Sequence, residues 1–309
     1  MHKEQIKICV QKADEAIKAK NLPEAERLLK EVIKLAKEMY EIDKENNDLQ
    51  LGAAFHRLAK FYSMIIRCDR MPVKPIVLDE KQKNLFKACE ALFHDAIRCT
   101  LQNGSKGKGI YVDFHSVCMH DMLVLYVAVG KYDDAIKHGA NGVHLEKAIY
   151  EKFDDVAHAF RLSERMTALA TAHALKKESV KAAELLEDSI FVLEEHEKED
   201  PLRFGLMLGR SYLTLAGNYE RQPEEAENVE STYLKGYDKF ETIQELSQGK
   251  FTEDMVTANI VLGEYYKRKE SPQSRGYFVE ALRLAEEYKE KNQSAKFDYI
   301  IAKLKVQVR

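Results

Sequence analysis

The stretch Leu58-Ala59-Lys60-Phe61-Tyr62 carries the pattern that decides the fold: a large apolar residue, a small one beside it, and an aromatic ring four positions on. Similar stretches begin at 122, 169, 215 and 262, so successive copies among these four are 47, 46 and 47 residues apart. The gap from 58 to 122 is 64 residues, which is 17 more than 47. Such a period is typical of a helical repeat array. The later copies read Met122-Leu123-Val124-Leu125-Tyr126, Leu169-Ala170-Thr171-Ala172-His173, Leu215-Ala216-Gly217-Asn218-Tyr219 and Leu262-Gly263-Glu264-Tyr265-Tyr266.

The physical reason for the pattern is helix packing. Residues i and i+4 lie on one helix face, and the small residue beside them lets a neighbouring helix approach closely. One helical hairpin cannot bury its apolar face alone, so neighbouring hairpins must stack. Stepping back 46 residues from 58 reaches Lys12-Ala13-Asp14-Glu15-Ala16, which keeps the small residue and lacks the ring, as expected of a terminal repeat.

Proline positions agree with paired helices. Pro23, Pro223 and Pro272 fall between the first and second helix of a pair, and Pro201 falls between pairs. Proline is tolerated in the first turn of a helix and disruptive in its interior. We therefore predict an all-α, right-handed solenoid of about six helix-turn-helix repeats with a C-terminal capping helix, forming a single domain over 1–309. The predicted helices span 3–19, 23–46, 49–66, 82–102, 111–129, 132–150, 155–176, 179–197, 202–220, 223–247, 252–269, 272–291 and 294–306.

Composition limits the function classes. Of the 309 residues, 45% are hydrophobic and 32% are charged, and the formal net charge of −3 gives no overall attraction to nucleic acid or anionic membrane. Charged residues interrupt the N-terminus within a few positions, and no apolar run approaches the length of about 20 that spans a membrane. We therefore expect a cytoplasmic protein. The five cysteines show no CxxC spacing, so reduced thiols are expected and no metal or other cofactor is predicted.

The pattern Leu-Ala/Gly-x-x-Tyr, followed by a turn and a second helix with alanine near its start, resembles the tetratricopeptide repeat. Gly130-x-Tyr132-x-x-Ala135 is similar to the inter-helix turn of that family. The common repeat is about 34 residues long, whereas the period near 47 resembles the lengthened repeats of kinesin-light-chain-like and bacterial regulator arrays. The resemblance covers almost the whole chain outside roughly 67–81.

The resemblance implies that the first helix of each repeat lines a concave face that binds a protein or peptide. The contact positions would be two before, two after and five after the first large apolar residue of each copy. Carried onto this chain, they are His56, Lys60 and Ser63; His120, Val124 and Val127; Thr167, Thr171 and Ala174; Leu213, Gly217 and Glu220; and Ile260, Glu264 and Lys267. The chain lacks the asparagine pairs of the kinesin-light-chain-like arrays, and its Lys7, Lys60, Arg210 and Lys267 are too dispersed for a carboxylate clamp.

Two irregular segments stand out. The 17 additional residues are placed at about 67–81, where Pro72 and Pro75 favour an extended path. The segment is either a lengthened surface loop or a segment that folds into the groove or contacts a partner, in which case Arg67, Arg70 and Lys74 would meet acidic groups. The glycine- and lysine-rich stretch 103–109 is a flexible connector or, alternatively, a phosphate-binding loop, although no strand precedes it.

The sequence also contains residues that could suggest a metal site or RNA binding. His115, Cys118 and His120 are close in sequence, but a helix places 118 and 120 on different faces, which favours packing over a metal site. The 28 Tyr and Phe residues (15 plus 13) suggest RNA stacking, but no basic face accompanies them. The leading hypothesis is a non-catalytic scaffold that binds a protein or peptide. The alternatives are a peptide-sensing regulator that sequesters a partner, and an enzyme using His56, His120 and Lys60. A homo-oligomer is compatible with the sequence.

Overall fold

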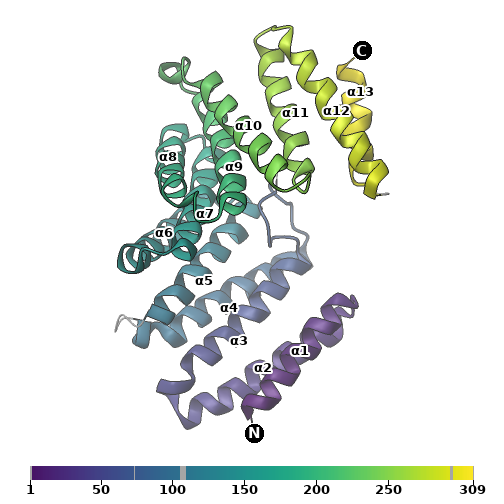
Figure 1. Ribbon diagram of the computed structural model, residues 1–309. Coiled ribbons are helices and arrows are strands. Elements are labelled where there is room, and N and C mark those ends of the chain that lie inside the picture. The colour runs from purple at the N-terminus through teal and green to yellow at the C-terminus, as the bar shows by residue number, and fades with distance from the viewer. Residues whose placement is uncertain (1, 73, 105–108, 293–294, 309) are drawn as a thin grey trace. The chain divides into compact units, whose positions relative to one another are not determined.

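The computed structural model describes residues 2–72, 74–104, 109–292 and 295–308. Within these ranges the secondary structure is thirteen α-helices and two short 3-10 turns, with no strand (Figure 1). The chain divides into two compact units, 1–176 and 177–309, each of which is described by itself. The all-helical prediction is confirmed for the described residues, while the expectation of a single domain stays a prediction.

Unit 1 contains seven helices that pack in sequence order as antiparallel pairs. Helix α5 also packs against α3 and α7, which are the first helices of the pairs on either side of it. First helices therefore lie next to one another, as a stack of hairpins requires. The helices are α1 (His2–Lys18), α2 (Leu22–Ile42), α3 (Lys44–Ile65), α4 (Glu80–Gly104), α5 (Gly109–Ala128), α6 (Tyr132–Phe153) and α7 (Val156–Leu175).

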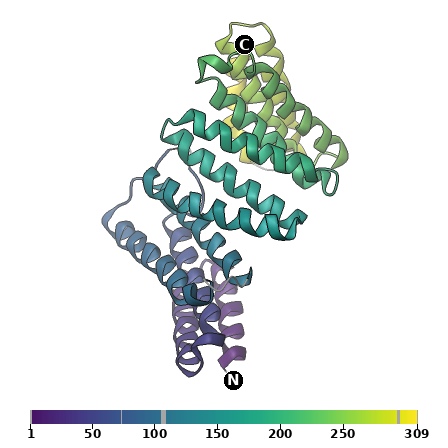
Figure 2. The ribbon, with the colours of Figure 1, turned by 90° about the vertical axis from the view of Figure 1, so that its left-hand side faces the viewer.

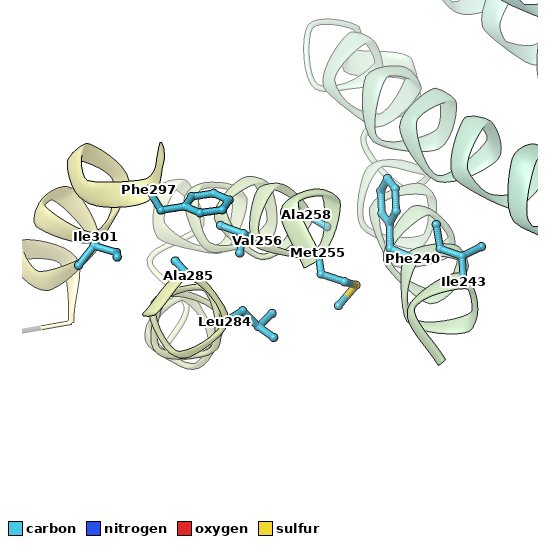
Figure 3. Close-up of a cluster of buried hydrophobic side chains, with 9 residues drawn as sticks. All are labelled: Phe240, Ile243, Met255, Val256, Ala258, Leu284, Ala285, Phe297 and Ile301. Carbon is cyan, nitrogen blue, oxygen red and sulfur yellow. The ribbon is translucent and has the colours of Figure 1, made fainter. Parts of the chain in front are cut away.

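Unit 2 continues the same pattern, with α8 packed on α9, α9 on α10 and α11 on α12, shown from green to yellow in Figure 2. Its helices are α8 (Ser179–His196), α9 (Pro201–Tyr219), η1 (Pro223–Glu225), α10 (Val229–Leu246), α11 (Thr252–Arg268), α12 (Gln273–Asn292), η2 (Ala295–Phe297) and α13 (Asp298–Gln307). The predicted last helix is confirmed: Phe297 and Ile301 join a cluster that also takes Leu284 from α12 and Met255 from α11 (Figure 3).

The helix boundaries differ most from the prediction at two places. The break between α2 and α3 is at Asp43, whose side chain accepts a hydrogen bond from the Asn46 N–H and so caps α3. The helix predicted from 223 instead begins as a 3-10 turn, and α10 starts only at Val229. Just before this turn, the Gln222 amide donates to the Ser179 carbonyl of α8, a tertiary contact that fixes the backbone there.

The repeated segments occupy the interior as the sequence predicts. Leu58, Met122, Leu169, Leu215 and Leu262 are all buried. The small position permits close packing, most clearly at Gly263, where an added Cβ would lie 2.7 Å from the ring of Phe278 in α12. The Tyr62, Tyr126, Tyr219 and Tyr266 hydroxyls each donate to a glutamate on the preceding second helix.

The additional segment between α3 and α4 is tied to unit 1. The Ile76 N–H donates to the Ala128 carbonyl at 2.8 Å, and Pro75 lies against Gly130, the turn residue with φ of 77°. Cys68 is buried, whereas Val77 is exposed. The segment is therefore a strap that runs from the end of α3 to the α5–α6 turn.

Candidate functional site

The strongest constellation lies on the first helices of unit 1. His56 and Lys60 are one turn apart on α3, and both reach Asp121 on α5. The His56 Nε2 atom lies 2.7 Å from Asp121 Oδ2, and Lys60 Nζ donates to Asp121 Oδ1 at 3.1 Å. The structure thus joins two of the predicted contact residues through a carboxylate from the next repeat.

Asp121 is the anchor of this constellation. Its side chain is 15% exposed, whereas that of Lys60 is 52% exposed. Burial alone would raise the pKa of Asp121, but the hydrogen bonds and charges of His56 and Lys60 outweigh it and hold that pKa below its usual value. The carboxylate therefore stays charged at neutral pH and fixes the orientation of both partners.

The His56 ring is also held by aromatic packing. It makes edge contacts with Phe93 and Phe114, with ring centroids 5.7 and 5.8 Å away. Among the described residues no hydroxyl or thiol is hydrogen-bonded to His56, so the pair orients an imidazole without an attached nucleophile. The second nitrogen of such a fixed imidazole is able to form one further hydrogen bond.

A hollow of about 550 Å³ opens beside this pair; we name it the His56 hollow. Its apolar lining comes from Ile17, Leu29, Ala53, Phe61, Met64 and Phe114, and its polar lining from Asp14, His56, Arg57, Lys60 and Asp69. The Arg57 guanidinium donates to Asp14 at 3.1 Å and links α3 to α1 across the rim. An apolar floor with a few oriented polar groups is the usual composition of a ligand site.

His120, on α5 beside Asp121, is partly buried, and its Nδ1 atom has no hydrogen-bond partner among the described residues. Burial, followed by the positive charge of Arg165, lowers the pKa of His120 to about 4. The imidazole is therefore neutral at physiological pH and cannot supply a positive charge to this face. His115 is one of the three residues considered for a metal site, and its Nε2 atom lies 2.7 Å from the Thr100 hydroxyl oxygen.

The other predicted residues of unit 1 vary in accessibility. Ser63 is buried, its hydroxyl donates to the Lys60 carbonyl, and its own carbonyl accepts from the Cys68 N–H at the end of α3. Val124, Thr167 and Thr171 are partly buried. The buried Val127 and the partly buried Ala174 complete the set implied by the resemblance.

The predicted residues of unit 2 fall into separate surroundings. Leu213 packs against two apolar clusters, and Glu220 accepts both hydrogen bonds of Arg268 at 2.8 Å. Lys267 donates to Gln307 of α13 at 2.7 Å. Glu264, Ile260 and Gly217 are partly buried.

The strap places its predicted cations and one carboxylate in different surroundings, and the predicted role of the cations stays a prediction. Arg67, Arg70 and Lys74 are exposed, and no ion pair joins them to a described residue. Asp69 from the same strap lines the His56 hollow, a role that the sequence did not suggest. The stretch 105–108 and residue 73 lie outside the described residues.

The sequence also missed two residues that build the site. Asp121 and Phe114 are both on α5, and their proximity to α3 depends on how successive pairs pack. A signal for Asp121 was present, because it directly precedes Met122, the first residue of its repeated segment.

A buried ion network lies at the α5–α6–α7 junction and stabilises unit 1 from within. Glu146 is fully buried, and its carboxylate accepts hydrogen bonds from Ser116 at 2.7 Å and Arg161 at 3.1 Å. A buried carboxylate is tolerated when it is fully hydrogen-bonded. The network therefore fixes how α6 and α7 meet α5, which carries the site residues.

Among the described residues, no three His, Cys, Asp or Glu side chains gather closely enough to hold a metal ion. No helix within the described ranges has both the length and the apolar character needed to cross a membrane. No family model matches the chain, and no curated protein matches it.

Proposed function

We propose that this chain is a tetratricopeptide-type repeat protein whose helix pairs wind into a solenoid, and that it works as a non-catalytic scaffold that binds a protein or peptide. The packing of successive antiparallel helix pairs, with first helices in contact, supports this architecture. The binding role rests on one observation: the His56 hollow has an apolar floor, and its rim carries two donors oriented by a single carboxylate.

The size and chemistry of the hollow favour one bulky apolar side chain of an extended or helical segment. Burying such a side chain contributes about 1.5–3 kcal/mol. His56 and Lys60 stand at the rim, where Lys60 can donate to a carbonyl of the bound segment and the second ring nitrogen of a neutral His56 can accept from one of its N–H groups. Their fixed orientation lowers the entropy lost on binding.

A peptide-library selection on the full-length protein tests the proposal. Peptides that survive selection are measured by isothermal titration calorimetry against the wild type and against Ala53→Met, which fills the hollow from an exposed helical position. We expect the variant to weaken binding about tenfold or more, equivalent to at least about 1.4 kcal/mol.

The matched control is Ala302→Met, at an exposed position of α13. It adds the same side chain elsewhere and is expected to leave the affinity unchanged. A library that yields no binder, or binders that ignore Ala53→Met, would remove the His56 hollow as the binding site.

A further inference from the structure

The late start of α10 creates a second hollow in unit 2. Because η1 and the residues after it replace the first turns of the expected helix, about 540 Å³ opens between this segment and the end of α11. We name it the Arg268 hollow. It is separate from the His56 hollow, and its residues play no part in the proposed peptide site.

The lining of this hollow carries more positive than negative charge. Arg221, Arg268 and Lys269 contribute three positive charges, and Glu220 is the one acidic residue among those that line it, which leaves a net charge of +2. Glu224, Glu225 and Glu227 follow in the same segment and do not line the hollow, but Glu225 and Glu187 lie close enough to the lining residue Tyr219 to raise its pKa. A concave surface with an excess of one sign of charge attracts ligands of the opposite sign.

Glu220 orients the Arg268 guanidinium while using only one of its three nitrogen atoms. Its Nη2 group donates to both Glu220 oxygens at 2.8 Å, and the Tyr233 hydroxyl donates to Glu220 at 3.2 Å. A guanidinium has five N–H donors, and no other hydrogen bond joins Arg268 to a described residue. The side chain is 53% exposed. The remaining edge of the guanidinium is therefore available for an anion in a fixed orientation.

The rest of the lining is apolar or aromatic. Tyr265 and Val229 are buried beneath the hollow, and Tyr219 stands at its side. The Lys269 ammonium lies 5.9 Å from the centroid of the Tyr265 ring, so a cation sits beside an aromatic surface. A ligand that fits both parts needs an anionic head and a flat or apolar stem.

We propose that the Arg268 hollow binds a phosphomonoester dianion carried on an aromatic or apolar stem. A phosphomonoester carries close to two negative charges at pH 7 and has three acceptor oxygens, which matches the surplus of two cations and the open guanidinium edge. The ligand is either a phosphorylated side chain of a partner protein or a free small aryl phosphate.

Calorimetric titration of the full-length protein with phenyl phosphate in 150 mM NaCl tests this site. We expect saturable binding that is at least tenfold weaker in Arg268→Ala. The matched control is Arg283→Ala on α12, because Arg283 is 50% exposed and also makes two hydrogen bonds to one glutamate, Glu280. This control, like Ala53→Met, is expected to leave phenyl phosphate binding unchanged.

Titrations with related compounds test whether the site recognises the phosphate group and where the phosphate comes from. Phenol or benzoate binding as tightly as phenyl phosphate would overturn the proposal, as would the absence of saturable binding or an equal loss in Arg283→Ala. A phosphotyrosine peptide that binds more than tenfold tighter than phenyl phosphate identifies a protein source, and equal binding identifies a free aryl phosphate. If Arg268→Ala unfolds, Arg221→Ala at an exposed position must give the same loss.

Discussion

The Tyr126 hydroxyl donates a 2.6 Å hydrogen bond to Glu90, which lies 36 residues earlier on the second helix of the preceding pair. The same bond, over the same separation, joins Tyr62 to Glu26 at 2.9 Å and Tyr266 to Glu230 at 2.8 Å. Tyr219 reaches Glu187 in the same way at 2.7 Å. In these four copies the aromatic ring of the repeated segment therefore does more than fill space, because its hydroxyl ties α3, α5, α9 and α11 to the pair before each of them. The copy on α7 carries His173 in place of the tyrosine.

Substitution of Tyr126 by Phe tests the contribution of the Tyr126–Glu90 hydrogen bond. The change keeps the ring but leaves the partly buried Glu90 carboxylate without its donor, so we expect a loss of about 1.5–3 kcal/mol in the free energy of unfolding. Urea denaturation measures it. The control is Tyr265→Phe, because the Tyr265 hydroxyl makes no hydrogen bond within the described part of the chain. If both variants lose the same free energy of unfolding, the Tyr126–Glu90 hydrogen bond contributes nothing to stability.

The same tyrosines predict an alkaline instability. Burial, followed by the glutamate hydrogen bond, raises the pKa of Tyr126, Tyr219 and Tyr266 above the ordinary value of about 10. The neutral hydroxyls stabilise the fold below pH 10, and this contribution is lost as the unfolded chain ionises first at higher pH. The stability of the wild type should therefore fall more steeply between pH 9.5 and 11 than that of a Tyr126→Phe/Tyr266→Phe variant. Parallel curves would refute the assignment.

Replacing glycine by alanine should have opposite effects on stability at Gly263, the small residue of a repeated segment, and at Gly276 of α12. At Gly263 an added Cβ would meet the buried Phe278 ring at 2.7 Å, so Gly263→Ala should destabilise unit 2 by about 1–3 kcal/mol. At Gly276, also within a helix, nothing lies within 4 Å of the added carbon. Gly276→Ala should therefore stabilise the protein by about 0.5–1 kcal/mol. Thermal unfolding of the two variants is the measurement, and equal shifts would contradict it.

The sequence predicted the helices well because the apolar period and the proline positions are local signals. It placed the start of the tenth helix six residues early, since residues 223–228 contain good helix formers after a proline that suits a first turn. The competing interaction was not local: Gln222 reaches back to the Ser179 carbonyl of α8. The hollow beside Arg268 lies at this segment, and no pattern within the segment indicated it.

In the candidate site, too, local spacing predicted which residues share a helix face, whereas contacts between helices could not be predicted. The i, i+4 spacing put His56 and Lys60 on one face of α3, as the structure finds. Their shared partner, Asp121, lies on α5, 65 residues from His56, and can be placed only once α3 and α5 are known to pack together. Ser63 shows the converse, because it is buried at a position that the repeat pattern assigned to the open face.

His120 should remain neutral in mildly acidic solution. Its pKa of about 4 lies below the ordinary value of about 6.5, so the folded state excludes a proton that the unfolded chain accepts. This stability contribution is complete above pH 6.5 and is lost as the pH falls toward 4. Imidazole NMR signals assigned by comparison with His120→Gln should show no titration of His120 between pH 7 and 5.5. A titration midpoint near 6.5 would contradict the buried environment.

Replacing Asp121 by Asn tests the anchor of the candidate site. The amide cannot carry the charge that orients Lys60 and His56, so we expect a loss of about 1–3 kcal/mol at pH 7. Because the folded pKa of Asp121 is depressed, its contribution is present above the unfolded value of about 3.9 and disappears as the pH falls through the folded value. The stability difference between wild type and Asp121→Asn should therefore shrink below pH 4. The control is Asp133→Asn, whose carboxylate is 86% exposed in its pair with Lys176 and should change stability by less than about 0.5 kcal/mol. If both variants lose the same amount, or if the Asp121 difference does not depend on pH, the carboxylate does not hold the two donors at the rim of the His56 hollow.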